Sequence, residues 1–182
     1  METEQIIKES LSKTLVFDIE TSAFKDDGTP IDISSEFNLY VKRAKVKWIG
    51  LYSFRDNAVL SVPVAGHEQE IKDYINGHDT LVGFNSEEFD FPILYNNRLV
   101  STDKWFMQLD LMRILGNDKF KGHKMRAMLM GIDLKSNRLK EMALKFGLET
   151  QKGDIDYKIF FKDTWTEQET IDIKKYLCGK SR

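Results

Sequence analysis

The amino-acid sequence predicts an α/β domain in which helices flank a mixed β-sheet. Residues 15–19 are mostly apolar and have the length of a buried strand. Residues 46–54 and 58–64 surround the polar turn at residues 55–57 and are expected to pair as a hairpin. Helical and strand-like segments then alternate along the chain, an order that is typical of neither an all-α nor an all-β fold.

The first elements begin close to the N-terminus. Apolar residues at helical spacing predict that residues 1–13 form a helical extension lying against the domain, which itself occupies residues 14–182. Residues 15–19 are apolar except at Asp18, a pattern that indicates a strand buried on both faces. Residues 22–44 have mixed polarity and are expected to form a long loop.

The middle of the chain continues with a helix around residues 67–77 and a strand at residues 80–84. Residues 87–99 are helix-like, and Pro92 must lie in the first turn or kink this helix because proline lacks a backbone N–H. The later elements follow in chain order: a strand at 105–109, a short apolar turn at 111–115, an ambiguous stretch at 116–133, and helices at 137–146 and 166–178. The segment Thr166-Glu-Gln-Glu169 matches a helix capping box.

Composition limits the class of protein. With 182 residues, 41% of them apolar, the chain can bury the core of one globular domain. Its 27 Lys and Arg nearly balance its 29 Asp and Glu, so no global basic field indicates nucleic acid, although a local groove with bound cations can hold phosphates. Cys178 is the only cysteine, which excludes an intramolecular disulfide and favours a reducing cytoplasm. The charged N-terminus and the lack of a membrane-length apolar run predict a soluble protein.

An acidic pair lies in the first predicted strand. Residues two apart on a strand share a face, so Asp18 and Glu20 present neighbouring carboxylates while Phe17 and Ile19 pack behind them. Such a pair is costly without a cation, and Mg²⁺ or Mn²⁺ is the usual compensation. The alternative is that the pair lies in water at the end of the strand.

A second polar segment, residues 81–94, runs from a strand into a helix. It places Asn85 at the strand end and Asp90 in the first helical turns, at the sheet edge where α/β folds commonly bind ligands. Asn85 is expected to hydrogen-bond a substrate, and Asp90 to face the acidic pair. Alternatively, Asn85 is a cap or turn residue and Phe89 belongs to the core.

These two segments resemble a known family. Leu15-Val-Phe-Asp-Ile-Glu-Thr21 is similar to the first motif of the DEDD 3′→5′ exonucleases, and Val82-Gly-Phe-Asn-Ser-Glu-Glu-Phe-Asp90 to their second. The resemblance is greatest to the exonuclease domains of family B DNA polymerases and their stand-alone relatives, and it implies a ribonuclease H-like fold. Residues 137–148 resemble the stretch before the third motif, so the similarity follows the family order over residues 14–180.

The third motif is incomplete. In this family it provides a tyrosine and, four residues later, an aspartate; Tyr176 matches the tyrosine, whereas Lys180 occupies the aspartate position. The final helix thus looks cut short. Asp172 lies one turn before Tyr176 and is too far from position 180 to substitute. Without the first two motifs, Tyr176 would be interpreted as an ordinary half-buried aromatic residue beside Ile173 and Leu177.

The resemblance implies an exonuclease that releases nucleoside 5′-monophosphates from single-stranded nucleic acid, with DNA expected before RNA. It also implies two Mg²⁺ or Mn²⁺ ions, a proofreading or repair role, and a partnership with a DNA polymerase or a replication or repair factor. The implied metal ligands are Asp18, Glu20 and Asp90, the implied catalytic residues are these three and Tyr176, and the implied nucleotide-binding residues are Thr21, Asn85 and Phe89. One alternative is a weakened or truncated homologue that binds nucleic-acid ends or a partner protein because Lys180 replaces the fourth acid. Another is an interaction domain that retains only the fold.

Other polar residues are expected to have structural roles. Asp110, at a predicted strand end, is interpreted as a helix cap rather than a metal ligand. His67, His78 and His123 are widely spaced, so they are expected on the surface or in loops rather than in a zinc site. The basic run at residues 119–126 is interpreted as a solvated loop, with contact to a nucleic-acid backbone as the alternative.

Overall fold

A five-stranded mixed sheet forms the centre of the molecule, as seen in a computed structural model that describes residues 2–115 and 155–178. The strands are β1 Thr14–Ser22, β2 Lys45–Ser53, β3 Ala58–Pro63, β4 Thr80–Gly83 and β5 Met107–Asp110. Their order is β3-β2-β1-β4-β5. The β1-β2 and β2-β3 pairs are antiparallel, and the β1-β4 and β4-β5 pairs are parallel. The predicted hairpin and fold class, a mixed sheet flanked by helices, are confirmed.

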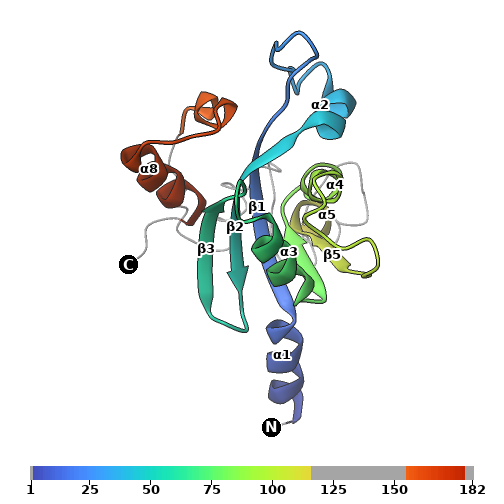
Figure 1. The fold of residues 1–182 in the computed structure, drawn as a ribbon. Coiled ribbons are helices and arrows are strands. Elements are labelled where there is room, and N and C mark those ends of the chain that lie inside the picture. Colours follow the sequence, from blue (N-terminus) through green and yellow to red (C-terminus); the bar gives the residue numbers. More distant parts are fainter. Residues whose placement is uncertain (1, 116–154, 179–182) are drawn as a thin grey trace.

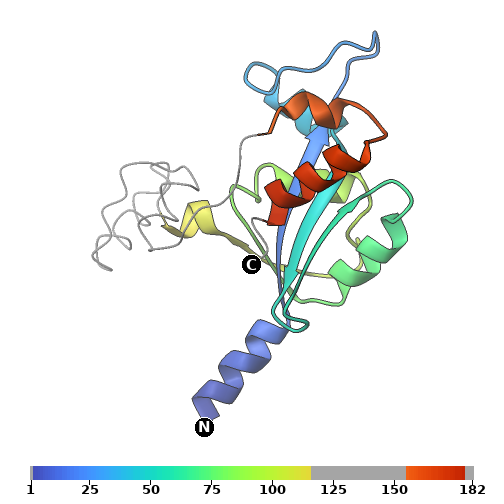
Figure 2. The same ribbon diagram turned by 90° about the vertical axis from the view of Figure 1, so that its left-hand side faces the viewer.

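Helices flank both faces of this sheet, and one further helix, α1 Glu2–Ser12, extends from its end (Figure 1). The others are α2 Phe37–Arg43, α3 Glu68–Asn76, α4 Asp90–Asn96, α5 Leu111–Leu115, the 3-10 helix η1 Tyr157–Phe161 and α8 Glu167–Cys178. Figure 1 shows α8 on one side of the sheet and α3 and α4 on the other, and in Figure 2 α8 crosses the face turned to the viewer. None of the helices in the described part of the chain is long and apolar enough to cross a membrane.

The two faces of the sheet are packed unequally. Leu15, Phe17 and Ile19 of β1 belong to the larger core, on the side of α3 and α4, whereas a smaller cluster around Trp48 and Phe160 lies under α8. Val16 and Asp18, on the second face of β1, are only half-buried. The expectation that this strand is buried on both faces therefore holds fully for one face only.

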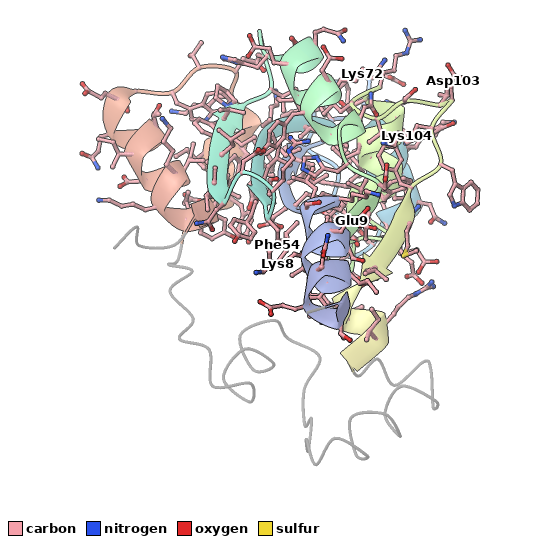
Figure 3. All side chains as sticks on the ribbon, turned by 90° about the horizontal axis from the view of Figure 1, so that it is seen from below. Lys8, Glu9, Phe54, Lys72, Asp103 and Lys104 are labelled. Carbon is pink, nitrogen blue, oxygen red and sulfur yellow. The ribbon has the colours of Figure 1, made fainter. Side chains whose placement is uncertain are left out.

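The predicted N-terminal helix exists, but its expected position is wrong. Ile6 and Ile7 are 59% and 54% exposed, so α1 buries no apolar face against the domain. Figure 1 shows the helix projecting from the lower end of the sheet, and Figure 3 looks at that end, with Lys8 and Glu9 on the helix. The N-terminal end of β1 thus leads to α1, and its C-terminal end carries the acidic pair.

Other boundaries differ in ways that concern the site. The predicted loop at residues 22–44 contains α2, whose Tyr40 is buried in the larger core. Helix α4 begins at Asp90 rather than at position 87, so Pro92 lies in its first turn. The capping box of α8 is confirmed, because the Thr166 N–H donates to Glu169 Oε2 at 2.9 Å and the Glu169 N–H donates to Thr166 Oγ1 at 3.3 Å. The interpretations of residues 116–133 and 137–146 lie outside the described residues.

Candidate active site

A pocket of about 650 Å³ opens at the C-terminal end of β1. It is lined by every residue that the sequence singles out for metal, catalysis or nucleotide: Asp18, Glu20, Thr21, Asn85, Phe89, Asp90 and Tyr176. These side chains come from β1, from the β4–α4 turn, from the start of α4 and from α8. The structure thus brings together three segments that are far apart in the sequence: residues 18–21, 85–90 and 176.

The acidic pair faces the side of the sheet that α8 covers. Asp18 lies opposite Gly50 on β2, and a Cβ atom at Gly50 would lie 3.5 Å from Leu177 of α8. Directly paired residues of neighbouring strands share a face, so Asp18 and, two residues on, Glu20 point to that side. Asp18 is half-buried and Glu20 is only 6% exposed.

The pairing of β1 with β2 changes register just after the acidic pair. Glu20 pairs with Trp48, whereas the next residue, Thr21, pairs with Val46, so β2 has one extra residue at this point. Such a bulge bends a strand and redirects its side chains. The extra residue lies on β2, so β1 keeps its alternation: Thr21 points to the face opposite Glu20, where its hydroxyl oxygen is 2.9 Å from that of Tyr40.

The third carboxylate is delivered by a tight turn between β4 and α4. Gly83 ends β4 where a Cβ atom would lie 2.5 Å from Ser86 Cβ, so the turn would have to shift to accept any side chain at this position. Asn85 follows with φ of 59°, a left-handed conformation that asparagine tolerates better than most residues. It is therefore a turn residue that also lines the pocket. Asp90, the first residue of α4, is 7% exposed.

Asp110, at the end of β5, holds this turn in place. Its buried carboxylate accepts hydrogen bonds from the N–H groups of Asn85 at 2.9 Å and Glu87 at 3.2 Å. It also accepts the Met112 N–H at 2.9 Å, which confirms the predicted capping role at the start of α5. The hydrogen bonds that join Asp110 to the β4–α4 turn had no local signal in the sequence, because Asp110 and Asn85 are 25 residues apart.

Aromatic side chains form one wall of the pocket. Phe89 packs between Phe37 and Tyr40 of α2, with ring centroids 6.1 and 5.9 Å away. Burial raises the pKa of Tyr40, so its hydroxyl stays protonated and hydrogen-bonds both the side chain and the carbonyl oxygen of Thr21. Phe89 is thus anchored in the edge of the core as one interpretation predicted, while part of it borders the pocket.

Tyr176 enters the pocket from α8 and is 7% exposed. Its hydroxyl oxygen lies 2.6 Å from that of Tyr157 in η1. Burial raises the pKa of Tyr176, and the hydrogen bond with Tyr157 and the negative charge of Glu20 raise it further. The phenol therefore remains neutral at physiological pH, and its hydroxyl can hydrogen-bond a water molecule or a phosphate oxygen.

Several lining residues were missed by the sequence analysis. Tyr157 and Phe161 come from η1, a 3-10 helix without the 3.6-residue period that reveals longer helices. Asp32 also lines the pocket, but its carboxylate accepts the Ser34 N–H at 3.0 Å and the Ser35 hydroxyl at 2.9 Å, and these bonds lower its pKa. The Asp32 carboxylate therefore stabilises the loop at residues 32–35. In the sequence, only the Asp-x-Ser pattern of residues 32–34 indicates such a turn.

The donor atoms of the pocket suit a hard divalent ion. Asp18, Glu20 and Asp90 provide carboxylate oxygens, the ligands that Mg²⁺ and Mn²⁺ prefer. Within residues 2–115 and 155–178, no three His, Cys, Asp or Glu side chains are grouped closely enough to hold one ion. The three acids thus surround a common space without forming a closed cage. Asp172 is exposed and bonded to Gln168, and Lys180 lies outside the described residues.

Neither of the two histidines in the described part of the chain lines this pocket. His78 lies in the loop between α3 and β4, one of the two places expected for it, but it is completely buried, with Nε2 3.0 Å from Ser53 Oγ and Nδ1 2.9 Å from the Tyr74 carbonyl oxygen. Burial is also the main reason why the pKa of His78 is lowered. His67 is half-buried at the start of α3, and His123 lies outside the described residues.

Comparison with known proteins identifies the family. Residues 15–162 match the model of the RNase_H superfamily, so the chain belongs to this superfamily, and the predicted ribonuclease H-like fold is confirmed. No curated protein matches the sequence.

Among solved structures, the family B DNA polymerase from the hyperthermophilic archaeon Pyrobaculum calidifontis has the same fold, with a TM-score of 0.56 and 17% sequence identity. The match covers 91% of this chain and 22% of the polymerase chain, so this chain spans about a fifth of the length of that protein. The resemblance to a family B polymerase that the sequence suggested therefore extends to the fold. Superfamily membership supports a nuclease-type activity, and nucleases of this fold generally use divalent metal ions.

Proposed function

We propose that the chain is a metal-dependent 3′→5′ exonuclease that removes nucleoside 5′-monophosphates from single-stranded nucleic acid, with DNA as the preferred substrate. One observation carries this proposal: Asp18, Glu20, Asp90 and Tyr176, which resemble the DEDD exonuclease motifs, line one pocket. Its volume of about 650 Å³ lies in the range of about 300–1,000 Å³ typical of small-ligand sites, which suits a terminal nucleotide.

The three carboxylates would hold the divalent ions. Bound Mg²⁺ or Mn²⁺ supplies positive charge against the phosphodiester and promotes ionisation of the attacking water. Glu20 and Asp90 are 6% and 7% exposed, so bulk water competes little with a ligand for their oxygens. Asp18 is half-buried, on the same face of β1 as Glu20.

The remaining residues would orient the substrate. Tyr176 is held neutral beside the acids, so its hydroxyl can direct a water molecule at the terminal phosphate. Phe89 can stack on a base with the part of its ring that borders the pocket. Asn85 lines the pocket from a turn whose backbone is fixed by Asp110. The hydroxyl and the carbonyl oxygen of Thr21 both bond Tyr40, so Thr21 would act mainly as part of the wall against which a nucleotide lies.

The test is degradation of single-stranded DNA and RNA carrying a 5′ fluorophore, with Mg²⁺, Mn²⁺ or EDTA. We expect a ladder of products shortened from the 3′ end, nucleoside 5′-monophosphates in solution, and no cleavage in EDTA. Asp18→Asn should reduce the rate by about a hundredfold or more, the scale of losing one electrostatic element of an active site. Asp172→Asn, an exposed change on α8, is the matched control and should be as active as wild type. Equal rates for wild type and Asp18→Asn would refute the proposal.

A second candidate is a weakened homologue that binds nucleic-acid ends, or a partner protein, without efficient turnover. The observation that favours it is Lys180, which stands where the resemblance predicts a fourth carboxylate. Binding of a labelled oligonucleotide without cleavage, followed by a gain of cleavage in Lys180→Asp, would support it. Efficient cleavage by the wild type would exclude it.

A further inference from the structure

Two tyrosine hydroxyls meet in the candidate active site. The hydroxyl oxygens of Tyr157 and Tyr176 are 2.6 Å apart, so one hydroxyl donates a hydrogen bond to the other. The rings are nearly perpendicular, with an interplanar angle of 86° and centroids 6.2 Å apart. Both side chains line the same pocket as Asp18 and Glu20. The pair therefore joins η1 to α8 directly beside the predicted metal ligands.

The backbone that carries Tyr157 is firmly anchored. Asp156 caps η1 by accepting the Lys158 N–H at 3.0 Å, and Phe160 is completely buried in the cluster with Trp48. The indole N–H of Trp165 donates to the Ile159 carbonyl oxygen at 2.9 Å. Figure 2 shows η1 (orange) and α8 (red) on the viewer's side of the sheet. These contacts hold η1 in place, so the Tyr157 hydroxyl has a defined position.

Stability alone does not require this hydrogen bond. Tyr157 is 59% exposed, so water could serve its hydroxyl at little cost. Tyr176 is different: it is 7% exposed, and its hydroxyl has one proton and two acceptor positions that turn about the C–O bond. A hydrogen bond to Tyr157 restricts that rotation, because the Tyr176 hydroxyl either donates its proton to Tyr157 or accepts the proton of Tyr157. It thereby decides whether the Tyr176 proton or its lone pairs face the carboxylates and the substrate.

We propose that Tyr157 is a positioning residue that sets the orientation of the Tyr176 hydroxyl during phosphodiester hydrolysis. The inference rests on the proposed exonuclease function and deepens it, because the residue expected to orient the attacking water is itself oriented by a second tyrosine. Tyr157 acts through Tyr176 and needs no contact of its own with the reacting atoms.

The kinetic test compares Tyr157→Phe, Tyr176→Phe and the double variant on single-stranded DNA. Tyr157→Phe removes only the hydroxyl of an exposed residue, so the fold should be retained. We expect kcat to fall about three- to tenfold with KM unchanged, the scale of one neutral hydrogen bond. The double variant should be no slower than Tyr176→Phe. Tyr95→Phe, which changes an exposed tyrosine on α4 outside the pocket, is the matched control and should match wild type.

A second readout does not depend on cleavage. In protein labelled with ¹³C at the ζ carbon of tyrosine, the Tyr176 signal is assigned by its loss in Tyr176→Phe. Tyr157→Phe should shift that signal and leave the other tyrosines in place. If the wild type cleaves no substrate, the proposed function is refuted, and this shift alone then decides whether Tyr157 fixes Tyr176.

Two results would overturn the inference. One is an unchanged Tyr176 signal in Tyr157→Phe, which would mean that the hydroxyls do not interact in solution. The other is a Tyr157→Phe enzyme as fast as wild type, or a double variant in which the two losses multiply, either of which would mean that the hydroxyls act independently.

Discussion

The turn that delivers Asn85 and Asp90 depends on the missing side chain of Gly83, so Gly83→Ala is a sharp test of the site geometry. The new Cβ atom would lie 2.5 Å from Ser86 Cβ, 2.7 Å from Ser86 Oγ and 3.3 Å from Phe17 Cε1. Favourable carbon–carbon contacts lie at about 3.5–4.0 Å, so the closest contact is too short by about 1 Å. Because a Cβ position is set by the backbone, no change of rotamer relieves the clash.

The cost follows from what must move. The Ser86 carbonyl oxygen accepts the Phe91 N–H at 2.8 Å, which ties the turn to α4, and the Asn85 N–H is held by Asp110. Overpacking of this kind typically costs about 1–3 kcal/mol. For a chain of this size, each kcal/mol lowers Tm by about 2–4 °C. Gly83→Ala should therefore melt about 2–12 °C lower, and it should lose nuclease activity at temperatures where it is still folded.

The assay is urea unfolding followed by circular dichroism, together with the nuclease assay. The double variant Gly83→Ala, Ser86→Gly removes the clashing Ser86 Cβ and should recover at least about 1 kcal/mol relative to the sum of the single changes. A wild-type unfolding midpoint for Gly83→Ala, or strictly additive effects in the double variant, would refute the steric reasoning.

Three further predictions concern the surroundings of the site. Asp110→Asn should lower stability by about 2 kcal/mol, because a carboxylate that accepts three backbone N–H groups is replaced by an amide; a wild-type urea midpoint would contradict this. Burial lowers the pKa of His78 in the folded protein, so its imidazole binds a proton more readily in the unfolded chain than in the folded one. Stability should thus fall as pH drops below about 6.5, and His78→Gln should flatten the dependence of the urea midpoint on pH between 5 and 6.5. Ile7→Gln on the exposed α1 should change the free energy of unfolding by less than about 0.5 kcal/mol. The buried control Ile71→Ala should lose about 2–5 kcal/mol, and equal losses for the two variants would mean that α1 packs on the domain.

The sequence predicted the parts of the site that depend on local pattern. The two-residue spacing of Asp18 and Glu20 placed both carboxylates on one face of a strand, and the strand-to-helix segment placed Asn85 and Asp90 at the sheet edge. Those inferences need only the periodicity of one element. The inclusion of Tyr176 needed the family resemblance, because no local rule brings α8 to β1.

Interactions between distant segments could not be predicted from the sequence. The seven residues of α2 lie in a segment of mixed polarity, a pattern that predicts a loop rather than a short helix. His78 has no pattern that distinguishes a buried histidine from an exposed one. The apolar residues of α1 have helical spacing, but spacing does not show whether a partner surface exists, and Ile6 and Ile7 remain exposed. Each of these features depends on what a segment packs against, which local periodicity does not encode.

Two of the candidate site residues are each held by a residue outside the proposed metal and nucleotide contacts, which bears on the mechanism. Asp110 fixes the turn bearing Asn85, and Tyr157 bonds Tyr176. A nuclease that acts through charges at fixed positions depends on such supports, since a displacement of about 1 Å can cost about a hundredfold in rate. Changes at the supports should therefore lower kcat more than they weaken binding of Mn²⁺ or of an oligonucleotide, whereas changes at the carboxylates should weaken Mn²⁺ binding directly. Titration of Mn²⁺ into Asp110→Asn and Asp18→Asn, with kcat measured on the same samples, separates the two classes. Equal loss of Mn²⁺ affinity in both variants would show that Asp110 acts on the metal site itself.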